Sequence, residues 1–193
     1  VGMRYNDPNL ALSLVGFHTY FSNLIVLDNS NSDSAPDNAG NVITKGIELN
    51  IDYLPPEKYQ FVPAGEVSYF LNFTFTNANL DGAASSTNSK TSLFSGGVDG
   101  SNVPYIPDHR LGLGADYELG NFDFGINMTY QSESYGTATE TETEIFNGAN
   151  NARAGRIDSY TLLHLRAGYQ VNDNIRLRAG ANNITDLEYI ATR

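Results

Sequence analysis

The clearest pattern in the chain is the alternation of apolar and polar residues over 110–130. Apolar side chains occupy every second position, the chain reverses at Gly120-Asn121, and the alternation then resumes. Successive side chains of a strand point to opposite faces, and a two-residue turn sets Leu119 opposite Phe122, so both apolar rows fall on one face. The pattern predicts a β-hairpin with one apolar and one polar face.

The same alternation recurs along most of the chain. No segment has a convincing helical period, and there is no run of about 18 apolar residues that would form a transmembrane helix. The sequence predicts an all-β chain of about seven or eight strands joined by up-and-down hairpins. The other expected strands cover 1–5, 10–28, 43–53, 66–77, 161–171 and 175–182.

The connections between these strands alternate in length. Short turns are expected at 6–9, 120–121 and 172–174, with a proline-rich link at 54–65, whereas the long polar connections cover 29–41, 77–108 and 136–156. Because consecutive antiparallel strands place alternate connections at opposite ends, every long loop falls at one end. This asymmetry favours an antiparallel transmembrane β-barrel whose apolar rows face lipid. A soluble β-sandwich, with the apolar rows in its core, is the alternative.

Composition narrows the partners. The formal net charge is −11, from 22 acidic and 11 basic residues, which argues against a broad basic surface for nucleic acid. The absence of cysteine excludes disulfides and thiolate metal sites. The 12 tyrosines would suit a membrane interface if they lie near strand ends, although ordinary β-propensity also explains them.

The sequence carries no catalytic constellation. His18, His109 and His164 fall on different strands, with no nucleophile or carboxylate at a motif spacing beside them. We therefore expect no enzyme activity, no cofactor and no metal site, and we expect His18 and His164 to point into the lumen. The acidic run at 139–144 could bind Ca²⁺ at the cell surface, but a solvated run is the simpler interpretation.

Arginines on the polar rows are expected to form ion pairs across the inner wall. The arginines are Arg166, Arg176 and Arg178, and their expected partners are Glu48, Asp116 and Glu118.

Four stretches resemble the C-terminal barrel portion of TonB-dependent outer-membrane transporters, nearest to the ferric dicitrate and siderophore receptors. They are TKGIELNIDY (44–53), NVPYIPDHRLGLGADYELGNFDF (102–124), RIDSYTLLHLRAGYQV (156–171) and RAGANNITDLEYI (178–190). The string NNITDLEY is the most specific of them. The resemblance implies about eight strands of a barrel of about 22, whose lumen is plugged by an N-terminal domain.

The resemblance also implies a function in the outer membrane of a Gram-negative bacterium. Members import ferric siderophores or citrate-like chelates with energy passed through TonB. Residues 1–193 would be the C-terminal part of such a barrel, lacking the plug, the N-terminal segment that TonB binds, and the final strand. The alternative function is a small eight-stranded outer-membrane barrel, or a soluble β-domain, with a structural or binding role.

Candidate ligand contacts follow from the charge of a ferric chelate. Because such a chelate is anionic, the loop arginines Arg153 and Arg156 could bind its carboxylate oxygens in bidentate fashion. Alternatively they are solvated, or pair with lipopolysaccharide phosphates or neighbouring acids. Tyr105 and His109, which flank the corner at 104–107, are further candidates. Outer-membrane lipid and lipopolysaccharide are the other expected partners.

Overall fold

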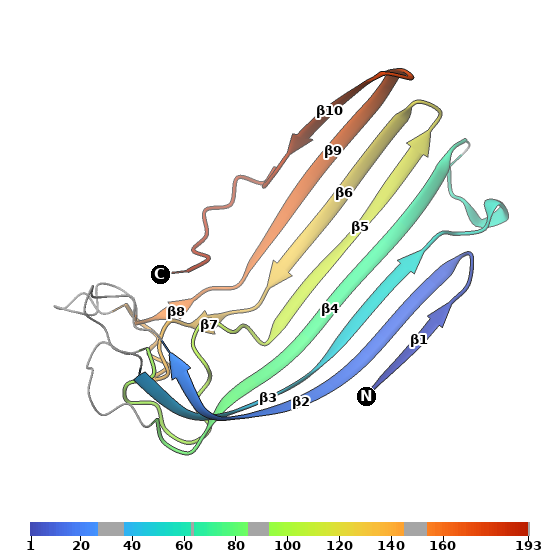
Figure 1. Cartoon of the computed structure of the whole chain (residues 1–193). Helices are drawn as coiled ribbons and strands as arrows, with labels where there is room; N and C mark the ends of the chain where they lie inside the picture. The colour runs from blue at the N-terminus through green and yellow to red at the C-terminus, as the bar shows by residue number, and fades with distance from the viewer. Residues whose placement is uncertain (27–36, 63, 85–92, 145–153, 193) are drawn as a thin grey trace.

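The computed structural model describes residues 1–26, 37–62, 64–84, 93–144 and 154–192. Within these ranges the strands form a curved antiparallel sheet in which neighbours follow one another in chain order, apart from β7 and β8, which form a small separate sheet (Figure 1). The main sheet has 8 strands in the order β1-β2-β3-β4-β5-β6-β9-β10. The all-β meander expected from the alternation is therefore confirmed. No helix in the described ranges is long and apolar enough to cross a membrane.

The elements are β1 Gly2–Asn6, β2 Leu10–Val26, β3 Asp37–Tyr53, the 3₁₀ turn η1 Glu57–Tyr59, β4 Glu66–Asp81, β5 His109–Leu119, β6 Phe122–Gln131, β7 Ser134–Tyr135, β8 Arg156–Ile157, β9 Tyr160–Asn172 and β10 Ile175–Ala181.

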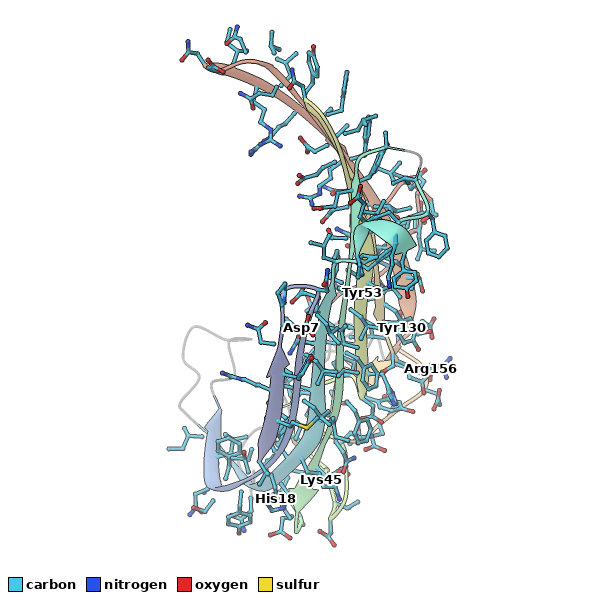
Figure 2. The ribbon with its side chains drawn as sticks, turned by 90° about the vertical axis from the view of Figure 1, so that its right-hand side faces the viewer. Asp7, His18, Lys45, Tyr53, Tyr130 and Arg156 are labelled. Atoms are coloured by element: carbon cyan, nitrogen blue, oxygen red, sulfur yellow. The ribbon has the colours of Figure 1, made fainter. Side chains whose placement is uncertain are left out.

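One face of the main sheet collects the apolar rows of neighbouring strands. Leu111 of β5, for example, pairs with Tyr130 of β6. Figure 2 shows the sheet edge-on as an arc with Tyr130 on its convex side, so the apolar rows line the convex face. These side chains are uncovered: Ile126 is 44% exposed and Leu165 43% exposed. A sandwich would bury this face in its core, so the sandwich alternative does not describe the structure.

Aromatic residues border the apolar rows at both ends of the convex face. At the short-turn end, Tyr117 stacks on Phe124 with ring centroids 6.4 Å apart, and Phe122 stacks on Tyr169 at 4.4 Å. Toward the long-loop end the aromatic residues on this face are Phe73, Phe75 and Tyr130. Leucine, isoleucine and alanine make up most of the space between, together with Met128 and Tyr69. Strands β5 and β6, of 11 and 10 residues, match the length of about 9–11 residues that a tilted strand needs to cross a bilayer.

The apolar and polar faces exchange sides where β2, β3 and β4 extend past the aromatic residues at the long-loop end. On the convex face the cross-strand row becomes His18, Lys45 and Asn77. On the concave face the extensions are apolar and buried, and loop residues pack on them. This small core consists of Ala39, Val42, Ala78, Leu80, Phe94, Val103 and Ala138. The outward face of the extensions therefore meets water, whereas the long loops fold inward over the concave side.

The extensions correct two expected boundaries. Strand β3 begins at Asp37, inside the connection expected at 29–41, and β4 ends at Asp81, inside the connection expected at 77–108. A register shift with Asn23 at φ 53° bends β2 where it pairs with this part of β3. The alternation fades there because the two faces exchange character. The pair β7 and β8 was also not expected.

Glycines on the concave face let large side chains lie flat on the sheet. A Cβ at Gly114 would overlap the ring of Phe70 and the carbonyl oxygen of Ile126. Gly112, two residues away on the same face, has more room: the nearest atom to a Cβ there would be Asn72 Nδ2 at 3.9 Å. Gly114 therefore has a packing role that Gly112 lacks.

This difference gives a matched pair of substitutions. We expect Gly114→Ala to destabilise the sheet by about 1–3 kcal/mol, because the ring or the neighbouring strand has to move. Gly112→Ala should be close to neutral. Urea unfolding of the micelle-bound protein, followed by far-ultraviolet circular dichroism, measures both, and equal losses for the two variants would contradict this packing account.

Candidate functional site

An ion pair crosses the concave wall near its middle. Asp116 of β5 and Arg166 of β9 lie on either side of Gly125 of β6 in one cross-strand row. Arg166 Nη2 is 2.5 Å from Asp116 Oδ1, and Arg166 Nε donates to the same oxygen at 3.2 Å. A Cβ at Gly125 would overlap both side chains, so this glycine allows the pair to form. The expected pairing of Arg166 with Asp116 is confirmed.

A second ion pair lies one strand further along, and its arginine is two residues away from the row that Asp123 shares with Gly168 and Arg178. The carboxylate of Asp123 on β6 lies over Gly168 of β9 and pairs with Arg176 of β10. The partner of Arg176 is thus Asp123 and none of the three acids expected from the sequence. The reason is distance along the sheet, because Asp123 lies one strand closer to β10 than the acids of β5 do. The ion pairs found among the described residues leave out three of the residues expected to form them: Arg178, Glu48 and Glu118.

A polar hollow of about 380 Å³ opens on the concave face beside Arg166. Its lining includes Asn127, His164 and Asn182, and His164 Nδ1 lies 3.2 Å from Asn182 Oδ1. His164 thus points to the concave side, as expected. Asn127 Oδ1 is buried and has no hydrogen-bond partner among the described residues. A buried carbonyl oxygen is costly to leave unpaired, so this hollow suits a group that donates a hydrogen bond.

A second candidate region, which we call the rim platform, lies at the long-loop end. It consists of β7, β8 and the residues around Tyr105. The backbone N–H of Tyr105 donates to the carbonyl of Tyr135 at 2.9 Å, and Tyr135 pairs with Arg156. The structure therefore brings two of the candidate ligand contacts, Tyr105 and Arg156, onto one platform. Arg153 lies outside the described residues.

Arg156 is surrounded by carboxylates from its own chain. Its side chain lies 3.1 Å from Asp158, 3.2 Å from Glu142 and 3.7 Å from Glu133. Glu142, Asp158 and Glu133 raise the pKa of the Arg156 guanidinium, which stays charged. Glu142 also accepts a hydrogen bond from the Tyr135 hydroxyl at 3.0 Å and raises the pKa of that hydroxyl. Because three acids surround one arginine, this part of the rim platform carries net negative charge.

Two histidines lie on the convex face. His109 packs against Phe75, with ring centroids 5.2 Å apart, and pairs with it across β4 and β5. This candidate ligand contact is therefore not grouped with Tyr105 and Arg156. His18 shares the face of Leu12 and Leu14, so the expectation that it points into the lumen is wrong. The convex row of β2 contains Leu12 and Leu14, whereas Val15 and Phe17 lie on the opposite face.

The acidic run at 139–144 is used within the chain. Glu140 accepts a hydrogen bond from the backbone N–H of Asn102 at 2.5 Å, and Glu142 binds Tyr135 and Arg156. Among the residues that the structure describes, no group of three or more His, Cys, Asp or Glu could hold a metal ion. The Ca²⁺ interpretation gains no support from this geometry.

The string NNITDLEY forms a turn that holds itself together. The Asn183 side chain accepts from the backbone N–H of Leu187 at 3.1 Å and donates to its carbonyl at 3.0 Å. Asn183 and Asp186 both have positive φ, at 50° and 52°, which asparagine and aspartate tolerate better than most residues. The ring of Tyr189 lies 4.5 Å from that of Tyr160 on β9. This string therefore has a structural role in the described chain.

An apolar hollow of about 490 Å³ lies on the convex face. Alanines line much of it, and the four are Ala115, Ala167, Ala179 and Ala181. Because this hollow opens on the apolar, convex face of the sheet, it suits a hydrocarbon chain and not a charged chelate.

The acid-bound arginine on the rim platform gives a testable expectation. Arg156→Gln should leave Glu133, Glu142 and Asp158 repelling one another, so proteinase K should cleave the segment 132–158 faster. Arg156→Lys keeps the charge and should restore part of the resistance. High salt should speed cleavage of the parent protein more than that of Arg156→Gln, because salt screens exposed charges. Cleavage rates that do not change in Arg156→Gln would contradict a structural role.

Comparisons with known proteins agree with this geometry. A family model described as TonB dependent receptor-like, beta-barrel, matches residues 1–184. Hemoglobin-binding protein A of Haemophilus influenzae is 26% identical over 168 residues, which is 84% of this chain and 14% of that protein. The unliganded ferric citrate transporter FecA superposes with a TM-score of 0.69 at 24% identity, over 97% of this chain and 26% of that chain.

A further solved structure has a similar fold. The siderophore receptor PiuA from Acinetobacter baumannii has a TM-score of 0.65 and 20% identity, over 99% of this chain and 24% of that chain. The chain thus spans about a quarter of the length of these solved structures. Because the family model matches nearly all of its 193 residues, the chain belongs to the TonB-dependent receptor β-barrel family, whose members are outer-membrane proteins of Gram-negative bacteria.

Proposed function

We propose that this chain is a section of the barrel of an outer-membrane receptor that takes up a ferric siderophore or a ferric citrate-like chelate. Energy would come from TonB through a region outside residues 1–193, and a plug domain would fill the lumen. The observation that carries the proposal is the two-faced sheet, apolar outside and charged inside, in a chain of this family.

The open sheet supports a section of a larger barrel. Strands β1 and β10 lie at opposite edges of the main sheet and do not pair with each other. The alternative of a closed eight-stranded barrel therefore lacks support. In hydrocarbon an unpaired strand edge is costly, so we propose that both edges pair with further strands of the same receptor.

The polar groups of the concave face support the proposal that a plug domain fills the lumen. The Asp116–Arg166 pair lies on the concave face, where a plug domain would meet it. The Asn127 oxygen, which has no hydrogen-bond partner among the described residues, lies on the same face. The named relatives support the substrate class, since they include a ferric citrate transporter, a siderophore receptor and a hemoglobin-binding protein. Because these substrates differ, we propose the class of ferric chelate and no single compound.

We propose that ligand contacts come from the rim at the long-loop end. Arg153 remains a candidate for an anionic chelate. Tyr105 is on the rim platform, whereas Arg156 is already bound by three carboxylates and we assign it to the structure of the platform. His109 packs on the convex face against Phe75, so we do not assign it to the ligand.

Lipid orientation has a direct mutational test. Ile126 and Asn127 are neighbours on β6 that point to opposite faces, and Ile126 lies between the aromatic residues that border the apolar rows. Ile126→Lys should impair membrane assembly, because a lysine on the lipid face near the midplane costs about 2–4 kcal/mol. Asn127→Lys should assemble normally. The measurement is the amount of heat-modifiable barrel in isolated outer membranes, and normal assembly of both variants would contradict the orientation.

Transport has a separate test in cells. The complete receptor is expressed in a Gram-negative strain that lacks its own receptors, and uptake of radioactive iron is measured with ferric citrate, a ferric siderophore and hemin. We expect uptake of at least one of them, and we expect that uptake to stop when the gene for TonB is deleted. Uptake that continues without TonB, or none for any iron source, would contradict the proposed function.

Arg153→Ala should weaken binding of an anionic chelate more than Arg156→Ala does.

A further inference from the structure

The proline-rich turn, of which the structure describes residues 54–62, 64 and 65, leaves the sheet on its convex side. In Figure 2 its 3₁₀ segment η1 lies to the right of the arc, on the side of Tyr130. The Tyr117 side chain, which is on the convex face, donates a hydrogen bond from its hydroxyl to the carbonyl of Ala64 at 2.9 Å. The end of the turn therefore passes over the face that the proposed function assigns to lipid.

The turn is held in this position by specific contacts at both ends. At its start, the N–H of Leu54 donates to the carbonyl of Asn9 at 2.8 Å, and the Asn9 side chain returns a bond of 2.8 Å. At its end, Gln60 replaces the missing partner strand of Val67. Its Oε1 accepts from the Val67 N–H at 2.9 Å, and its Nε2 donates to the Val67 carbonyl at 3.3 Å.

Gly65 allows the turn to close against β5. Its φ is 81°, in the left-handed region, and a Cβ there would overlap the Glu118 carbonyl and the Tyr117 ring. Val67 is 9% exposed, whereas Tyr69, next in its row, is 38% exposed. These contacts show a fixed turn that returns to the convex face and not a loop that extends away from the sheet.

The fixed turn presents two aromatic rings and a cation outward. Phe61 is 90% exposed and Tyr59 56% exposed. Lys58 Nζ lies 4.6 Å from the centroid of the Tyr59 ring. Rings and lysines in this arrangement are typical of membrane interfaces, where the ring lies at the level of the headgroups and the ammonium reaches phosphate. The turn is also joined to the aromatic residues at the short-turn end of the convex face, because Tyr117, which binds Ala64 of the turn, stacks on Phe124.

We propose that Lys58, Tyr59 and Phe61 form an interfacial anchor that binds the glycerophospholipid headgroup region of the periplasmic leaflet. The turn is at the short-turn end, which faces the periplasm in outer-membrane barrels. The inference rests on the proposed function, because it needs the convex face to meet lipid. It adds a specific lipid contact made by a turn outside the strands, which would fix the height of this side of the barrel in the membrane.

The test places one tryptophan at a time in the complete receptor, using the fact that this chain has no tryptophan of its own. Phe61→Trp is the reporter. Asn174→Trp, in the tight turn between β9 and β10 at the same end, is the matched control, and Ile126→Trp reports the centre of the apolar face. Each receptor is reconstituted in vesicles of phosphatidylcholine with phosphatidylglycerol, with lipids brominated near the headgroup or near the chain end. The emission of the parent receptor is subtracted.

We expect bromine near the headgroup to quench Phe61→Trp. It should leave Asn174→Trp unquenched, whereas aqueous iodide should quench Asn174→Trp. Phosphatidylglycerol should increase the quenching of Phe61→Trp relative to phosphatidylcholine alone. In the double variant that also carries Lys58→Gln, this increase should be smaller. If Ile126→Trp is quenched by chain-end bromine while Phe61→Trp is quenched only by iodide, the anchor is wrong and the barrel orientation stands. If Ile126→Trp is also unquenched by lipid, the proposed function fails as well.

Discussion

The structure depends on one constraint, that backbone groups in hydrocarbon have to be paired by a neighbouring strand. Lipid offers no hydrogen bond to an exposed N–H or C=O, so a chain that crosses with strands pairs each one with its neighbours. The meander order satisfies this with neighbours in sequence, because each strand from β1 to β5 lies beside the next one in the chain, as Figure 1 shows. With the backbone paired in this way, the side chains are free to differ completely between the two faces.

The two faces of the sheet therefore carry different kinds of side chain. The convex face carries Leu, Ile and Ala between aromatic residues, whereas the concave face carries charges that are matched across glycines. The glycines matter because a guanidinium or a phenyl ring can lie flat only where a neighbour has no Cβ. The Asp116–Arg166 pair is partly open to solvent, so its net stabilisation is small, about 0.2–1 kcal/mol. Its role is to shape a polar wall more than to stabilise the sheet.

Much of the fold could be predicted because strand alternation is local. The hairpin at 110–130 agrees with the observed strands His109–Leu119 and Phe122–Gln131, and Gly120 has the positive φ that a tight primed turn requires. The extensions of β3 and β4 were missed because the faces exchange character beyond the aromatic residues, and alternation alone does not say which row faces out. His18 was assigned to the wrong face for the same reason.

The candidate site was less predictable because it depends on which loops meet. The sequence identified Tyr105 and Arg156 as candidates, but not that Tyr135 lies between them or that Glu133, Glu142 and Asp158 surround the arginine. Arg176 was paired with the wrong acids because the choice depends on strand order and distance. Gln60 gave no signal at all, since its role as a substitute strand partner for Val67 depends on where β3 ends.

The central claim is that the convex face contacts hydrocarbon and the concave face contacts water. The most direct measurement is a cysteine scan of β6, position by position from Phe122 to Gln131, in the complete receptor in native outer membranes. The account predicts that a water-soluble maleimide labels Asp123, Asn127 and Thr129 positions, that a lipid-soluble reagent labels Phe124, Ile126 and Met128 positions, and that the two patterns alternate. Maleimide labelling of the Phe124, Ile126 and Met128 positions would contradict it.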